Sequence, residues 1–286
     1  MTGDPSALDA WEVGARYEAY VGRWSRAVAR EFVRILRTSG GRWLDVGCGG
    51  GALVQAILEQ AVPESVVALD RSLGFLRYAR TRAGAAFHAA DAQALPFSSG
   101  RFDAVVSGLV LNFVGDPGKM VEEMVRVARP GATVALYVWD YAGRMEMIRH
   151  FWSAAMALDP GAAALDEAAR FPICAPGPLR ALFEAAGVSR VTVGAIDVPT
   201  VFRDFDDYWM PFLGGQGPAP GYVASLGKGR QIALRERVRS ALSHASDGSI
   251  PLRARAFSVH GIKVDATREQ SPRGPASQEG DGPIRR

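Results

Sequence analysis

The sequence has little that would point to a disulfide framework, a metal site, a membrane or a nucleic-acid partner. It has only two cysteines in 286 residues, Cys48 and Cys174, and their separation fits neither paired disulfides nor metal-ligand spacing. No run of 18 or more apolar residues occurs, and the first residues lack the basic start and apolar stretch of a secretory signal. The net charge of +3, from 33 basic and 30 acidic residues, is too slight to indicate nucleic-acid binding. We therefore expect a cytoplasmic protein with no metal site.

Strand-like and helix-like segments alternate at short spacing across residues 42–139. Short apolar runs at 42–46, 65–69, 85–89, 102–109 and 133–139 are each separated by a helical pattern or a turn. Two further strands are expected at 188–198 and 252–264, the second with a bulge between Ala256 and Phe257 where the apolar alternation changes. This pattern predicts an α/β fold with a doubly wound, mostly parallel, seven-stranded sheet.

The segments outside this alternation predict the domain organisation. Residues 1–40 are interpreted as an N-terminal helical segment, and residues 41–265 as one domain. Within the domain, insertions at about 141–176 and 200–248 are helical and partly rich in aromatics, and we interpret them as a lid. Residues 266–286 contain almost no apolar side chains and are expected to be a disordered tail.

A glycine turn with nearby acids carries the main functional signal. The turn reads LDVGCGGG at 44–51, between a predicted strand and a predicted helix, and it holds Gly47 and Gly49. Glycines allow a tight turn and close approach of a ligand to the backbone. Asp45 precedes the turn, Asp70 ends the second strand and Asp91 follows the third. A carboxylate at the end of the second strand can accept hydrogen bonds from both ribose hydroxyls of a nucleoside.

The same turn also fits a dinucleotide-binding pattern, because Gly47, Gly49 and Ala52 satisfy G-x-G-x-x-A. An NAD(P)-dependent oxidoreductase therefore remains an alternative. Asp45 favours a different ligand, because a carboxylate beside the turn suits an ammonium and a sulfonium and would repel a pyrophosphate.

The set of motifs resembles class I S-adenosylmethionine (SAM)-dependent methyltransferases, and most closely the group that includes ubiquinone and menaquinone C-methyltransferases. The motifs are LDVGCGGG at 44–51, ALD at 68–70, DAQALPF at 91–97, FDAVVSGLVLNFV at 102–114 and VARPGATVALYVW at 127–139. The resemblance covers about residues 40–140 and implies a Rossmann-like methyltransferase fold with SAM as the cofactor.

Site residues follow from the same resemblance. It implies that Asp45 and the turn hold the methionine part of SAM, that Asp70 binds the ribose, that Asp91 and Ala92 flank the adenine, and that Ser107 lies under the cofactor. The complete set of expected cofactor contacts is Asp45, Gly47, Cys48, Gly49, Asp70, Arg71, Asp91, Ala92 and Ser107.

Candidate acceptor contacts come from three regions. Tyr17 lies in the N-terminal segment, which in the resembled family can fold over the cofactor, and Asn112 follows the fourth strand where relatives often carry His-His. Asp140 and Tyr141 lie just beyond the fifth strand, at the edge where open α/β sheets bind ligands. Tyr208 and Trp209 belong to the aromatic part of the second insertion, and packing of that insertion explains them equally well.

The predicted function is transfer of a methyl group from SAM to a small-molecule acceptor, at an O, N or C nucleophile that the sequence leaves open. No catalytic residue is assigned, because such a transfer needs a general base only if the nucleophile must lose a proton. A SAM-binding protein without catalysis and a nucleic-acid methyltransferase remain as alternatives beside the oxidoreductase.

Overall fold

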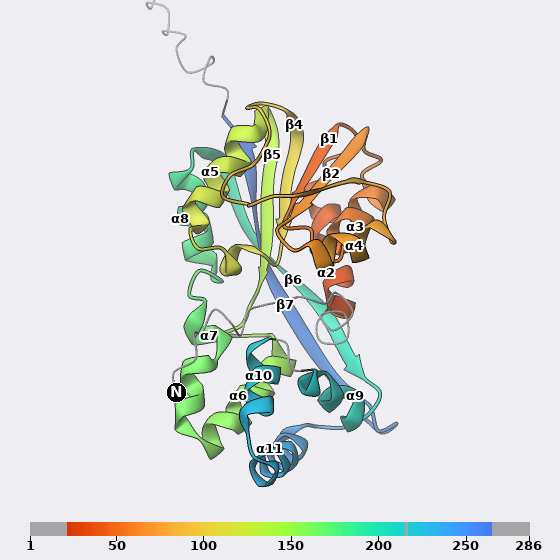
Figure 1. The fold of residues 1–286 in the computed structure, drawn as a ribbon, viewed down its shortest axis with the longest axis vertical. Helices are drawn as coiled ribbons and strands as arrows, with labels where there is room; N and C mark the ends of the chain where they lie inside the picture. Colours follow the sequence, from red (N-terminus) through yellow and green to blue (C-terminus); the bar gives the residue numbers. More distant parts are fainter. Residues whose placement is uncertain (1–21, 215–216, 265–286) are drawn as a thin grey trace, which may run out of the picture.

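The computed structural model describes residues 22–214 and 217–264, so Tyr17 and the predicted tail lie outside the described residues. Figure 1 shows a sheet-bearing part above and a helical part below, joined by two long strands. The strands are β1 (Arg42–Val46), β2 (Ser65–Asp70), β3 (Ala86–Ala89), β4 (Phe102–Gly108), β5 (Ala128–Trp139), β6 (Val188–Phe202) and β7 (Ile250–Lys263). The helices are α2 (Arg23–Leu36), α3 (Ala52–Gln60), α4 (Leu73–Arg80), η3 (Leu111–Phe113), α5 (Pro117–Val127), α6 (Glu146–Leu158), η4 (Pro160–Leu165), α7 (Glu167–Arg170), α8 (Pro176–Ala185), α9 (Phe205–Trp209), η5 (Met210–Leu213), α10 (Pro218–Ser225) and α11 (Lys228–Ala241).

The described strands form one seven-stranded sheet in the order β3-β2-β1-β4-β5-β7-β6. Strands β1 to β5 pair in parallel, and β7 runs antiparallel to both of its neighbours. The prediction of a mostly parallel, seven-stranded α/β fold is therefore confirmed. The strand order reverses between β1 and β4, and in open α/β sheets a ligand crevice lies at the carboxyl ends of such strands.

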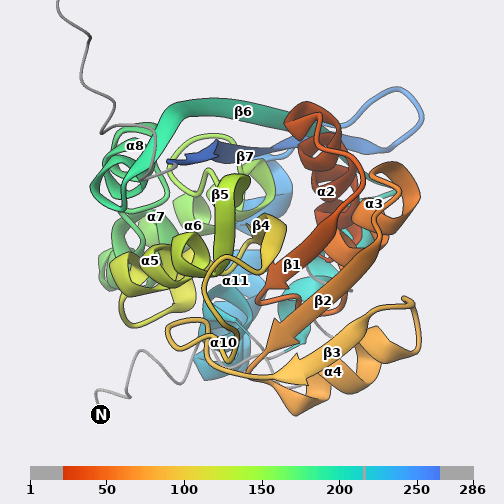
Figure 2. The same ribbon diagram turned by 90° about the horizontal axis from the view of Figure 1, so that it is seen from above.

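Helices cover both faces of the sheet, as Figure 2 shows from above. Helices α2 and α3 pack side by side on one face, and α5 and α8 lie on the other. Local signals fix the helix starts: the Ser72 hydroxyl caps α4 by accepting the N–H of Phe75, and Asp116 caps α5 directly before Pro117. None of the described helices is long and apolar enough to cross a membrane.

The two predicted insertions come together at the far ends of β6 and β7. They form what we call the helical lobe, which consists of α6, η4, α7, α9, η5, α10 and α11 (Figure 1). Its centre is aromatic: Phe151, Trp152, Tyr208 and Phe212 are fully buried, and the rings of Phe151 and Phe212 stack with centroids 4.6 Å apart. This aromatic centre is continuous with the hydrophobic core of the sheet-bearing part.

The predicted bulge in the last strand is wrong. The pairing of β7 with β6 is unbroken at Ala256 and Phe257, and the irregularity lies on β6 between Ser189 and Thr192. The apolar alternation changes near Phe257 because helices cover both faces of the sheet there, so that Ser258 and Val259 are both fully buried. The sixth strand is also longer than expected and ends at Phe202.

Candidate functional site

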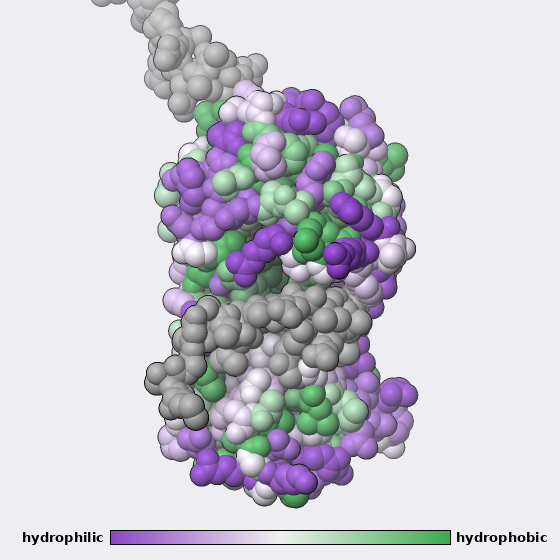
Figure 3. Space-filling model, viewed as in Figure 1, coloured by the Kyte–Doolittle hydropathy of each residue, from purple (hydrophilic) through white to green (hydrophobic). Residues whose placement is uncertain are grey.

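A cavity opens at the carboxyl ends of the central strands. Figure 3 shows apolar surface gathered around a hollow midway along this face. Eight of the nine residues predicted to contact the cofactor line the cavity, namely Asp45, Gly47, Cys48, Gly49, Asp70, Arg71, Asp91 and Ala92. The structure therefore brings these residues together around one space.

The glycine turn between β1 and α3 needs its glycines. Gly47, Gly49 and Gly51 have φ angles of +76°, +49° and +85°, in the left-handed region that side chains disfavour. A Cβ atom at Gly47 would lie 2.5 Å from a methyl group of Val110, so the turn and the end of β4 approach closely only without a side chain there. The backbone of the turn consequently borders the cavity directly.

Asp70 holds the glycine turn in place. One of its carboxylate oxygens accepts the N–H of Gly49 at 2.9 Å, and the other accepts the N–H of Ser72 at 2.8 Å. Each oxygen keeps a further lone pair for a ligand hydroxyl. Burial raises the pKa of Asp70, and the two backbone N–H groups act in the opposite direction. Asp70 therefore links β2, the glycine turn and the start of α4 at the cavity wall.

Asp45 is buried and unpaired. Its side chain is 1% exposed, and within the described part of the chain neither carboxylate oxygen has a hydrogen-bond partner. Burial, reinforced by the negative charge of Asp70, holds the pKa of Asp45 well above its ordinary value. A buried carboxylate without a partner is unfavourable, so the position calls for a cationic ligand group. The same burial raises the pKa of the Cys48 thiol, which keeps it protonated and unsuited to nucleophilic attack.

The loop after β3 is fixed by its own side chains. One Asp91 oxygen accepts the N–H of Gln93 at 2.8 Å, and the Gln93 side-chain oxygen accepts the N–H of Asp116 at 2.8 Å. Asp91, Ala92 and Gln93 all line the cavity. Ser107 does not line it, because its hydroxyl turns to the backbone and donates to the carbonyl of Val46 at 2.7 Å.

Another part of the cavity wall is apolar, and the sequence did not single it out. It consists of Leu109, Val110, Phe113 and Val114 after β4, with Tyr137 from β5. The Tyr137 phenol crosses Gly108, where an added Cβ atom would lie 2.5 Å from the hydroxyl oxygen. The position of these apolar residues at strand ends could have marked them as cavity residues. In a sequence, however, apolar residues at strand ends look the same as core residues.

Most residues predicted to contact the acceptor have packing roles instead of cavity positions. Asp140 accepts the N–H groups of Gly143 and Arg144 at 2.8 and 3.0 Å, which shapes the turn after β5. Tyr141 packs on Phe171 at 5.7 Å between ring centroids, and Phe171 packs on the cavity residue Phe113 at 5.4 Å. The first insertion thus reaches the cavity wall through Phe171.

The remaining three candidates are buried away from the cavity lining. Asn112 in η3 is 9% exposed. The Tyr208 hydroxyl donates to the carbonyl of Met147 at 2.7 Å, and Trp209 stacks on Phe205 with centroids 6.1 Å apart. Tyr208 and Trp209 therefore belong to the core of the helical lobe, and a direct acceptor contact from either remains a prediction.

Comparison with known proteins relates the part of the chain that carries strands β1 to β5 to methyltransferases. Residues 44–136 match the family model described as a methyltransferase domain. The chain is 38% identical over 115 residues to a demethylmenaquinone methyltransferase of Renibacterium salmoninarum, covering 40% of this chain and 46% of that protein. It is 35% identical over 112 residues to a malonyl-acyl-carrier-protein O-methyltransferase of Pseudescherichia vulneris, covering 39% and 43%. The chain therefore spans less than half the length of these curated relatives.

The fold agrees with a solved structure of a proposed methyltransferase from Bacillus halodurans. The TM-score is 0.55 at 16% identity, covering 84% of this chain and all of that one. This likeness concerns the fold alone. The family match and the relatives bear out the resemblance to SAM-dependent methyltransferases over residues 44–136, and the solved structure bears out the fold. The comparisons also support SAM as the cofactor.

Proposed function

We propose that the protein transfers a methyl group from SAM to a small-molecule acceptor. SAM supplies a methyl group bound to a positively charged sulfur, and the bonding electron pair stays on sulfur when the methyl group moves to the acceptor. The protein's part is to bind both molecules, align them and exclude water.

The observation that supports this proposal most strongly is the charge of the cavity. Asp45, Asp70 and Asp91 line it, and among the described residues of the lining only Arg71 is cationic. SAM carries an ammonium and a sulfonium, whereas a dinucleotide carries a pyrophosphate that these carboxylates would repel. Asp45 is the residue we assign to the methionine end, Asp70 to the ribose and Asp91 to the adenine.

Calorimetric titration of the protein with SAM, with its demethylated product S-adenosylhomocysteine and with NADH tests the proposal. We expect binding of the first two and none of NADH. Binding of NADH in preference to SAM would instead favour the oxidoreductase. Binding of SAM without any methylated product, in a broad set of acceptors, would favour a SAM-binding protein without catalysis.

The acceptor is proposed to lie against the apolar wall formed by Leu109, Val110, Phe113 and Tyr137. This wall is next to β4 and β5, whereas Asp45 and Asp70 lie at the ends of β1 and β2 and Asp91 follows β3. The cofactor then occupies one half of the cavity and leaves the other half for the acceptor. Small-molecule methylation in the cytoplasm remains our expectation for the whole protein.

A further inference from the structure

A group of buried donors without partners lies where α2 meets β6 and the helical lobe. In the described part of the chain, no hydrogen-bond partner exists for Nε and Nη2 of Arg23, Nε1 of Trp24, or the hydroxyl of Thr200. Buried polar groups are nearly always satisfied in folded proteins, so several orphans in one region require an explanation. A ligand rich in hydrogen-bond acceptors would satisfy all of them.

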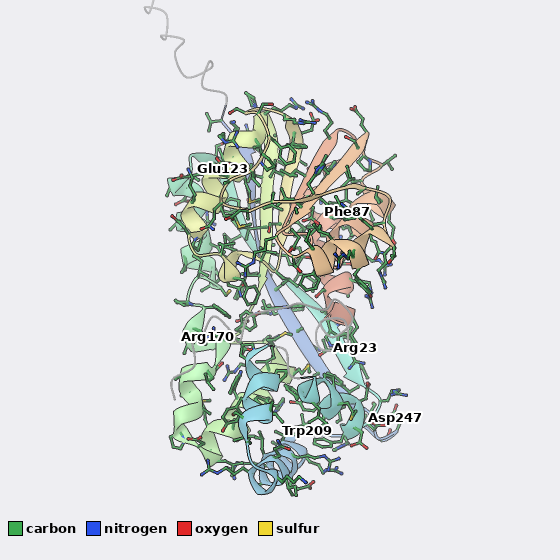
Figure 4. The ribbon with its side chains drawn as sticks, in the orientation of Figure 1. Arg23, Phe87, Glu123, Arg170, Trp209 and Asp247 are labelled. Atoms are coloured by element: carbon green, nitrogen blue, oxygen red, sulfur yellow. The ribbon has the colours of Figure 1, made fainter. Side chains whose placement is uncertain are left out.

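Contacts place these residues together. The Arg23 guanidinium lies 4.4 Å from the ring centroid of Trp24 and 4.7 Å from that of Phe202, and these two rings are 5.5 Å apart. Thr200 lies two residues before Phe202 in β6, so their side chains project from the same face of the sheet. Figure 4 shows Arg23 at the level where the sheet-bearing part meets the helical lobe.

The free edge of Arg23 has the geometry that binds a carboxylate. Its Nη1 donates to both oxygens of Asp207 in α9, at 3.1 and 3.4 Å. This contact leaves the Nε–Nη2 edge, which presents two parallel N–H groups as a fork. Arg203 also lies 3.8 Å from Asp207 and shares this carboxylate with Arg23.

Two of the elements that carry the donor group, α2 and β5, also border the cavity of the proposed methyltransferase site. Ser25, two residues after Arg23, lines that cavity. Trp139 in β5 lies opposite Ala256 in β7, and Ala256 lies opposite Ile196 in β6. Ile196 is four residues before Thr200, so Trp139 and Thr200 project from the same face of the sheet. Its indole Nε1 is also buried and has no partner among the described residues. Trp139 follows the cavity residue Tyr137 by two positions, so it extends the donor group from β6 toward β5.

We propose that the methyl acceptor carries a carboxylate, which the Nε–Nη2 edge of Arg23 binds at the junction of α2, β6 and the helical lobe. The proposal rests on the methyl-transfer function proposed above. The hydroxyl of Thr200 and the indole of Trp24 donate to the same anion. The apolar body of the acceptor lies along the cavity wall, and the acid group anchors it at the lobe.

The test compares two probes that differ in charge, benzoate and benzamide. The full-length protein, saturated with S-adenosylhomocysteine, is titrated with each probe by calorimetry or ligand-observed NMR. Benzoate should bind more tightly than benzamide. Arg23→Gln should weaken the binding of benzoate at least about tenfold, because charge-assisted hydrogen bonds are lost, and should have little effect on the binding of benzamide. Arg203→Gln is the matched control, because this arginine is 84% exposed and contacts the same Asp207, and it should leave benzoate binding unchanged.

Two further variants keep the test decisive if Arg23→Gln disturbs the fold. Arg23→Lys retains the charge without the fork, and Thr200→Val retains the shape without the hydroxyl; both should weaken benzoate and leave the melting temperature near that of the parent. Equal affinity for the two probes, or unchanged benzoate affinity in both of these variants, would overturn the proposal. Failure of S-adenosylhomocysteine to bind would count against the proposed function instead. In that case, titration of the protein with benzoate in the absence of S-adenosylhomocysteine would still test whether Arg23 binds a carboxylate.

Discussion

Asp45→Asn should make the protein more stable and less able to bind SAM. In the described structure this carboxylate is buried, has no hydrogen-bond partner and lies near the charge of Asp70. Because its pKa is raised in the folded state, the neutral form is favoured, and its contribution to stability is lost as the pH rises through that pKa. The amide of asparagine has nearly the same shape and no charge, so it removes this penalty at neutral pH.

The size of the gain is bounded. Keeping a carboxyl group neutral at pH 7 against an ordinary pKa of about 3.9 costs at most about 4 kcal/mol. The buried amide has no partners either, which costs about 1–3 kcal/mol. The net gain is therefore at most about 3 kcal/mol, and the melting temperature should rise by at most about 8 °C for a protein of this size. Loss of a charge-assisted contact to the ligand should weaken SAM by about 2–4 kcal/mol, or roughly 30- to 700-fold.

Thermal unfolding without ligand and calorimetric titration with SAM measure the two effects. Asp103→Asn is the matched control. Its carboxylate accepts the N–H of Arg42 and pairs with Arg129, and these contacts lower the pKa of Asp103. The control should lose stability and keep its SAM affinity. A lower melting temperature for Asp45→Asn, or SAM affinity equal to that of the parent, would refute the reasoning. The parent's SAM affinity should also fall as the pH falls through the Asp45 pKa, and the affinity of Asp45→Asn should not.

Three other variants test separate parts of the account. Burial raises the pKa of Glu167 from its ordinary 4.5 to about 7, so its contribution to stability is lost as the pH rises between these two values; Glu167→Gln, which can still accept from Trp152, should flatten the dependence of the melting temperature on pH between about 4.5 and 7. Tyr208→Phe should cost about 1 kcal/mol in urea unfolding and leave SAM affinity unchanged, whereas weaker SAM binding would place this residue at the site. Gly108→Ala should displace the Tyr137 phenol and lower the affinity for SAM several-fold in calorimetric titration. An unchanged affinity would mean that the phenol does not border the bound cofactor.

The sheet and the cofactor half of the site were predictable because their signals are local. A short apolar run, a glycine turn and an acid at the next strand end fix β1, the turn and Asp70 within about 30 residues of each other. The structure adds a role that the sequence did not show, since Asp70 also accepts the N–H groups of Gly49 and Ser72. Asparagine at position 70 would place an amide N–H₂ against one of these donors, so it is not a mild substitution there.

The helical lobe and the acceptor half were predictable only in outline. The tie between Arg23 and Asp207 joins residues 184 positions apart, and no periodic pattern announces such a contact. Aromatic residues such as Trp209 look alike in a sequence whether they line a cavity or pack a core. The expected bulge near Phe257 failed for a related reason, because the loss of alternation came from burial on both faces of the sheet.

The most direct test of the central claim is mass spectrometry of a metabolite pool incubated with the protein and methyl-labelled SAM. The account predicts label in a small molecule, formed in step with S-adenosylhomocysteine, and loss of both products in Asp45→Asn at limiting SAM. It further predicts that the labelled molecule is an acid in the anionic fraction of the pool. Binding of NADH with no label transferred to any acceptor would contradict the methyltransferase assignment.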